Sequence, residues 1–214
     1  MLKTALAEIV GTFIIVFIGT AGMVADTAMA GKLTAVGVCL IWGFAVFLAI
    51  VVAERIGQGH FNPAVTIVSA IKERLGFSAI LLHIVFQCIG AILASIVLSL
   101  FAPNGSDLGA TVPRLGLGYV FLIEVVISFC LLAVIEFTVI KKLSLLKAAL
   151  LIGVYIFIAA IITGPYTGCS MNPARTFGPW LIGSFKDGLW LYITAPILGM
   201  LLAYAAFRPF AKAA

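Results

Sequence analysis

The sequence carries one short motif twice, once in each half. Asn62-Pro63-Ala64 and Asn172-Pro173-Ala174 are each followed by one variable residue and then by a threonine. Asparagine is a preferred N-cap and proline is favoured at the first helical position, so each copy predicts the start of a helix. The surrounding chain is 64% hydrophobic and only 10% charged, which places both helix starts in or at a membrane. Irregular backbone at that depth is tolerated only where it is buried in protein or lines a water-filled cavity, so the repeat indicates a pore.

Six apolar segments are long enough for the roughly 20 residues that a membrane-spanning helix needs. They cover about residues 4–25, 33–53, 78–101, 118–139, 145–164 and 186–208. The first is longer than the apolar core of a signal peptide and contains Glu8, so we expect it to be a retained span. Two shorter stretches, about 62–73 and 172–183, begin at the motifs, and such helices cover only about half of the hydrocarbon core. The sequence therefore predicts an all-α membrane protein with six transmembrane helices and two re-entrant half-helices.

The segments fall into two similar halves, about residues 1–105 and 118–214, of a single channel domain that covers residues 1–214. Each half has three spans, with a half-helix between the second and the third. Because three is odd, the second half must enter the membrane from the opposite face. The sequence therefore predicts an inverted repeat, which is a common architecture among transport proteins with a site near the midplane.

The basic residues predict how the chain is oriented in the membrane. With the N-terminus inside, nine basic residues fall on the cytoplasmic side and three outside, with Arg175 set apart. The nine are Lys3, Arg55, Lys72, Arg74, Lys141, Lys142, Lys147, Arg208 and Lys212, and the three are Lys32, Arg114 and Lys186. This excess follows the positive-inside rule and predicts a multi-pass protein of the cell membrane with both termini in the cytoplasm. It also accounts for the net charge of +5 without a nucleic-acid partner.

The two motifs and Arg175 are candidates for contact with a solute. The side-chain oxygen of each asparagine can accept from backbone N–H groups of its own half-helix, which leaves the NH₂ group as a donor beside the positive end of the helix dipole. Two such ends near the midplane would attract a solute oxygen and repel cations, including a hydrated proton. Arg175 has no acidic neighbour in the sequence, so we expect its guanidinium to screen charge in a narrow part of the pore.

Glu8 and Glu124 are ionisable residues inside apolar segments, so each should face the protein interior and have a partner there. One interpretation is a proton relay. The alternative, which their matched placement favours, is a pair of structural acids that accept backbone N–H bonds from the re-entrant loops. His60, two residues before Asn62, is a candidate for the inner pore mouth, and we expect His83 to be a hydrogen-bonded interior histidine.

Three stretches, together with Glu8 and Glu124, resemble the major intrinsic protein family of aquaporins and aquaglyceroporins. They are Gly59-His60-Phe61-Asn62-Pro63-Ala64-Val65-Thr66, Gln87-Cys88-Ile89-Gly90 and Met171-Asn172-Pro173-Ala174-Arg175. The resemblance covers essentially the whole chain. It implies a right-handed bundle of six spans and two half-helices, a pore through each protomer, and a homotetramer in the lipid bilayer.

The resemblance also implies a narrow outer filter, whose positions carry over by spacing to Trp42, Ala160, Cys169 and Arg175. Strict water channels of the family typically have histidine at the position of Ala160, and tryptophan at the position of Trp42 is more typical of glycerol-conducting members. Against that, aquaglyceroporins usually have aspartate where this chain has Thr176. The filter is therefore mixed, with a wide, apolar side that suits glycerol.

We therefore expect a passive channel for water and small uncharged solutes, with glycerol as the leading one and with protons and ions excluded. A strict water channel is one alternative, and a proton-coupled secondary transporter that uses Glu8 or Glu124 is another. A membrane protein with a closed pore is a third. We expect neither an enzyme nor a metal or cofactor site, because the sequence contains no CxxC and no Ser/His/Asp or metal-spaced cluster.

Overall fold

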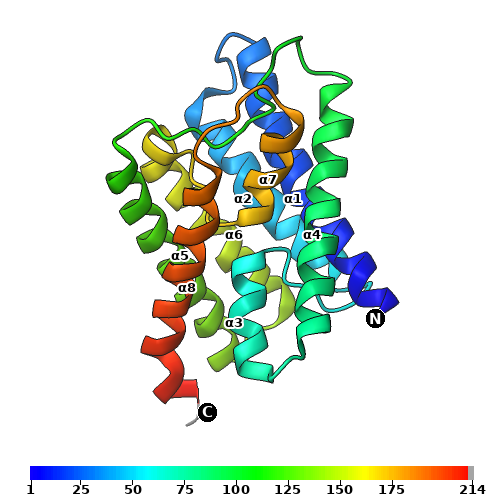
Figure 1. The fold of residues 1–214 in the computed structure, drawn as a ribbon, viewed down its shortest axis with the longest axis vertical. Helices are drawn as coiled ribbons and strands as arrows, with labels where there is room; N and C mark the ends of the chain where they lie inside the picture. The colour runs from blue at the N-terminus through cyan, green and yellow to red at the C-terminus, as the bar shows by residue number, and fades with distance from the viewer. Residues whose placement is uncertain (212–214) are drawn as a thin grey trace.

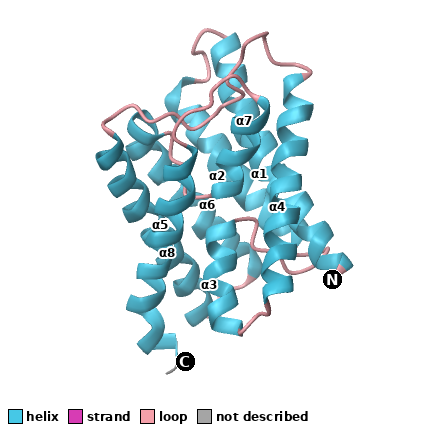
Figure 2. Cartoon of the chain, in the orientation of Figure 1, coloured by secondary structure: helices cyan, strands magenta, loops and turns pink. Residues whose placement is uncertain are grey.

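The computed structural model describes residues 1–211, with side chains described through Arg208; this stretch contains eight helices and no strand (Figures 1 and 2). The helices are α1 (Leu2–Ala28), α2 (Thr34–Ala53), α3 (Pro63–Glu73), α4 (Phe77–Ser99), α5 (Leu117–Ile140), α6 (Leu145–Thr167), α7 (Pro173–Ile182) and α8 (Leu189–Ala211). All except α3 and α7 are long and apolar enough to cross a membrane. The prediction of six spans and two half-helices is confirmed for the described residues.

The observed helix ends lie within three residues of the predicted ones. The largest differences include α6, which continues past Pro165 to Thr167 instead of ending near residue 164. Gly168 then ends the helix with a φ of 76°, and its N–H donates to the carbonyl of Gly164 at 2.9 Å. Glycine enters this left-handed conformation without the steric cost that other residues incur. The helix therefore ends at Gly168 and not at Pro165.

The half-helices α3 and α7 begin near the middle of the bundle and run toward its opposite ends (Figure 1). We call these ends the α3 end and the α7 end. The first turn of α1 and the last turn of α8 lie toward the α3 end (Figure 1). The two half-helices also contact each other where they begin.

The helices of the two halves make matching contacts. Helix α1 packs against α2 and α4, just as α5 packs against α6 and α8. Helix α7 lies against α4, α3 lies against α8, and contact between α2 and α6 completes the bundle. The closest approaches match as well: a Cβ on Gly90 would lie 2.5 Å from the carbonyl oxygen of Ile9, and one on Gly199 would lie 2.2 Å from that of Val125. Small residues at these crossings let the helix backbones approach closely.

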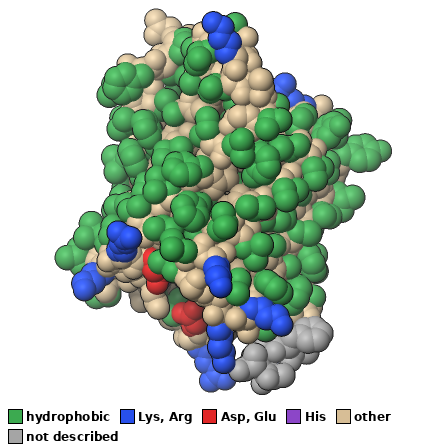
Figure 3. All heavy atoms as spheres, turned by 180° about the vertical axis from the view of Figure 1, so that it is seen from behind, with side chains coloured by type: hydrophobic (Ala, Val, Ile, Leu, Met, Phe, Trp, Pro, Cys, Tyr) green, Lys and Arg blue, Asp and Glu red, His purple; other side chains and the backbone are tan. Residues whose placement is uncertain are grey.

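The surface is apolar around the middle and charged toward the α3 end. Hydrophobic side chains cover most of the face in Figure 3, and lysine and arginine gather near its lower end. Eight of the nine basic residues predicted to be cytoplasmic lie at the α3 ends of their helices or in the adjoining turns, and Lys212 lies outside the described residues. Lys32, Arg114 and Lys186 lie in the connections at the α7 end. An apolar middle of this kind suits contact with lipid chains.

Candidate functional site

A buried carboxylate holds the loop that precedes each motif. Glu8 accepts backbone N–H bonds from His60 and Phe61, both at 2.7 Å. Glu124 makes the same pair of bonds, each at 2.9 Å, to the two residues before Asn172. Both glutamates are fully buried. Each carboxylate therefore fixes two consecutive N–H groups directly before an asparagine, and these N–H groups account for the burial of its charge.

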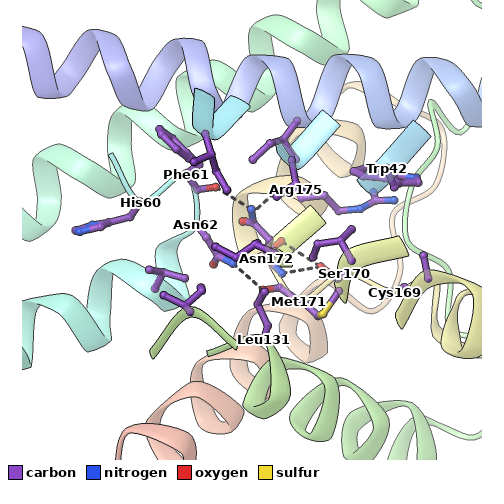
Figure 4. A pocket seen from close by; sticks show the side chains of 18 of the residues that line it. Trp42, His60, Phe61, Asn62, Leu131, Cys169, Ser170, Met171, Asn172 and Arg175 are labelled. Atoms are coloured by element: carbon purple, nitrogen blue, oxygen red, sulfur yellow. Dashed lines mark hydrogen bonds between the residues drawn. The ribbon is translucent and has the colours of Figure 1, made fainter. Parts of the chain in front are cut away.

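These bonds stabilise a backbone conformation that the side chains themselves disfavour. Phe61 has a φ of 55° and Met171 a φ of 52°, which is left-handed backbone. Such a conformation costs a non-glycine residue about 1–2 kcal/mol. It directs the carbonyl of each residue toward the opposite loop, where Asn172 Nδ2 donates to Phe61 O and Asn62 Nδ2 donates to Met171 O, both at 2.8 Å (Figure 4). The two motifs are therefore linked to each other across the centre of the bundle.

The asparagine side chains also cap their own half-helices. Asn62 Oδ1 accepts from Ala64 N at 2.9 Å, and Asn172 Oδ1 accepts from Ala174 N at 3.0 Å and Arg175 N at 3.3 Å. Each amide NH₂ carries two hydrogens, and one of them is used by the bond to the opposite loop. Part of each NH₂ group is therefore used within the protein. One N–H of each asparagine remains.

The asparagines of both motifs line a cavity of about 940 Å³. Its wall includes all four residues predicted for the filter, namely Trp42, Ala160, Cys169 and Arg175, as well as both asparagines and both histidines. Figure 4 shows Trp42, Arg175 and Cys169 on one side of the asparagines and His60 on the other. The structure therefore places the four predicted filter residues, both asparagines and His60 around one cavity. The remaining motif residues are buried and are not part of its wall, namely Pro63, Ala64, Pro173 and Ala174.

Arg175 is buried and is held by neutral groups. Its Nη1 donates to the carbonyl of Gly109 at 2.9 Å, and its Cζ lies 4.3 Å from the centre of the Trp42 ring. No carboxylate among the described residues lies within salt-bridge distance of it. Burial lowers the pKa of Arg175 to about 10, so the guanidinium still carries its charge at neutral pH. Its Nε has no protein partner in the described part of the chain.

Two titratable side chains of the loops are shifted toward their neutral forms. Burial lowers the pKa of His60, whose Nδ1 lies 3.1 Å from Thr66 Oγ1. Burial also raises the pKa of the Cys169 thiol, which is partly exposed in the cavity. At neutral pH these shifts favour an uncharged imidazole and a protonated thiol.

Some residues of the site were not found from the sequence. The carbonyl of Gly109 belongs to the connection between α4 and α5, which lies over α7 and is also bound there through Thr111 Oγ1 and Thr176 Oγ1, 2.9 Å apart. No local pattern indicates such a tertiary contact. His83 is the hydrogen-bonded interior histidine expected from the sequence, and Gln87, four residues further along α4, reaches Glu8 as well. Their shared helix face was a usable signal.

Comparison with known proteins identifies the family. Residues 1–207 match the family described as major intrinsic protein. The chain belongs to the major intrinsic protein family. A probable NIP-type aquaporin of Nicotiana alata is 36% identical over 203 residues, which are 94% of this chain and 75% of that protein. Nodulin-26 of Glycine max is 34% identical, over 92% of this chain and 74% of its own length.

A solved structure shows the same fold. The aquaglyceroporin of Plasmodium falciparum superposes with a TM-score of 0.88, covering 100% of this chain and 99% of its own, at 23% identity. Major intrinsic proteins are passive channels rather than enzymes. This member is accordingly a multi-pass membrane channel for water and small solutes, and the resemblance drawn from its motifs is confirmed.

Proposed function

We propose that this channel conducts glycerol as well as water and excludes protons and ions. The observation that carries the proposal is the contact of Trp42 with Arg175 in a cavity whose wall also includes a small residue, Ala160. The indole offers an apolar wall to a carbon backbone, and the guanidinium offers donors to hydroxyl groups. Alanine leaves room that a larger side chain would fill.

Charge exclusion would come from three groups along the cavity. The N-terminal ends of α3 and α7 carry the positive ends of their helix dipoles, and one N–H of each asparagine remains to orient a solute oxygen. Arg175 adds a full positive charge. Cations, including a hydrated proton, would meet positive potential at each of these points. We further propose a homotetramer of independent pores with both termini in the cytoplasm, which makes the α3 end the inner mouth.

Stopped-flow light scattering on proteoliposomes would test the solute. We expect both water and glycerol permeability to exceed those of protein-free vesicles. Ala160→His should narrow the filter and lower the ratio of glycerol to water permeability about tenfold, equivalent to about 1.4 kcal/mol. Ala160→Ser adds polarity with little volume and should leave that ratio near the wild-type value. An unchanged ratio in Ala160→His, or no glycerol flux in the wild type, would contradict the proposal.

A proton-coupled transporter is the rival of a different class, and the bonding of the two glutamates disfavours it. Each carboxylate already accepts two backbone N–H bonds, so moving a proton onto it would weaken a loop that carries a motif. Solute uptake against its gradient, driven by an imposed pH difference across the vesicle membrane, would support the rival. Uptake that follows only the solute gradient would support the passive channel.

A further inference from the structure

The two buried carboxylates have different surroundings, although they hold their loops in the same way. Glu124 accepts, besides its two backbone bonds, one from Thr167 Oγ1 at 2.8 Å. Glu8 lies instead 2.5 Å from His83 Nδ1 and accepts from Gln87 Nε2 at 3.0 Å. In the second half of the chain, a glutamate with a hydroxyl partner and no imidazole is thus enough to hold the loop before the motif. Holding the loop therefore does not explain why His83 lies beside Glu8.

Two imidazoles gather around one oxygen of Glu8. The rings of His60 and His83 are stacked with their centres 4.5 Å apart. The Nδ1 atoms of His60 and His83 lie 3.9 Å and 2.5 Å from Glu8 Oε1, respectively. One possible ligand atom from each of the three residues lies within 4.8 Å of the others. A carboxylate with two imidazoles is a donor set that suits first-row transition metals, and zinc in particular.

The cluster can be reached from the cavity. His60 and His83 both line it, with 17% and 11% of their side-chain surfaces exposed. Glu54 and Glu73, at the α3 ends of α2 and α3, line the same cavity, as does Lys72, which pairs with Glu136. An ion arriving from this end would reach His60 without passing Arg175, which lies beyond the asparagines (Figure 4).

We propose that Glu8, His60 and His83 form a binding site for a divalent transition-metal ion of the Zn²⁺ type, and that an ion bound there obstructs the α3-end mouth of the channel. A tetrahedral zinc ion with ligands at about 2.0–2.2 Å keeps them about 3.4 Å apart. The observed separations of 2.5 Å and 3.9 Å fall on either side of that value. Bringing both separations to that value takes shifts of about 1 Å or less, and the stacked imidazole rings must also turn so that both nitrogens face the ion. Water from the cavity would fill the fourth position.

The charge and protonation of the cluster suit a cation. Glu8 is fully buried, and among the described residues no full positive charge lies within salt-bridge distance of it unless a histidine is protonated. Imidazole binds a metal ion in its neutral form. Binding would release the hydrogen that His83 Nδ1 shares with Glu8. Magnesium and calcium prefer oxygen ligands, so they should not compete at similar concentration.

Metal binding to purified protein tests the site directly. The protein should carry an affinity tag without histidine, and Cys39→Ser with Cys169→Ser should remove the thiols that line the same cavity. In this background we expect one Zn²⁺ per protomer by calorimetry, and visible absorption bands on addition of Co²⁺. His83→Phe, which keeps an aromatic ring, should weaken zinc binding at least tenfold. His83→Asn keeps a hydrogen-bond donor for Glu8 and should weaken it as well.

Flux measurements test the obstruction. Zinc on the α3 side of oriented vesicles should slow water flux in the background protein, and equal Mg²⁺ should not. The two His83 variants should resist zinc, each compared with its own zinc-free flux. Unchanged zinc affinity in both variants would overturn the site, as would the absence of stoichiometric binding in the background protein. Zinc that binds without slowing flux would overturn the obstruction, whichever solute the channel conducts.

Discussion

Single residues of this channel determine both its backbone and its chemistry. Each glutamate accepts hydrogen bonds from two backbone N–H groups that, being buried, have no water to bond. A charge-assisted hydrogen bond of this kind contributes about 1.5–3 kcal/mol. Two such bonds offset the cost of the left-handed residue before each asparagine, about 1–2 kcal/mol. The strained residue in turn presents the carbonyl that the opposite asparagine binds. Glutamate, left-handed residue and asparagine thus form one connected unit, present twice.

At the same scale, Cys169 provides a chemical test of the outer filter. Its thiol is partly exposed in the cavity beside the other filter residues. A thiol reagent added from the α7 side should slow flux, and Cys169→Ser should abolish that effect. Because burial raises the pKa of this thiol, the thiolate is scarce at neutral pH. Alkylation should therefore quicken about tenfold per pH unit up to the raised pKa.

Two other cysteines serve as controls for this experiment. Cys39 also lines the cavity, whereas Cys88 is not part of its wall. Cys88→Ser should leave inhibition of flux unchanged, and Cys39→Ser shows whether a second thiol contributes. If the Cys169→Ser protein is still inhibited to the wild-type extent, Cys169 does not lie in the conducting path.

At the scale of elements, the sequence predicts the helices closely and the contacts of the site only in part. Apolar length and the Asn-Pro signal are local, so spans and half-helices follow from them to within three residues. The four predicted filter positions come from the family resemblance, and all four line the cavity. The bond from Arg175 to Gly109 and the link between the asparagines join residues 66 and about 110 positions apart. Such contacts depend on how loops fold over the bundle, which no local pattern encodes.

The crossing of α1 with α4 gives a prediction about packing. A Cβ on Gly90 would lie 2.5 Å from the backbone oxygen of Ile9, and that oxygen cannot move without moving α1. Gly90→Ala should therefore separate the two helices and destabilise the protein by about 1–3 kcal/mol. Because Glu8 precedes Ile9 on α1, the loop before the first motif should loosen too. Thermal unfolding in detergent would measure the loss.

Matched glycines make this test specific. Gly199→Ala meets the equivalent carbonyl of Val125 at 2.2 Å and should be at least as damaging. A Cβ on Gly118, near the start of α5, meets no atom within 4 Å, so Gly118→Ala should not lower the unfolding temperature. Equal stability of the Gly90 and Gly118 variants would show that the α1–α4 crossing tolerates a wider spacing.

At the scale of the whole molecule, the side chains of a single chain line the cavity, among them the asparagines of both motifs and the four predicted filter residues. If protomers assemble as the proposed tetramer, each pore should therefore conduct alone. Mixed oligomers of wild-type and Cys169→Ser protomers would test this, with the two forms tagged differently and co-expressed at several ratios. After thiol treatment, the residual flux should rise linearly with the fraction of Cys169→Ser protomers. A curve that bends below the line would mean that one blocked protomer hinders flux through its neighbours. That result would contradict independent pores, because each cavity is lined by a single chain.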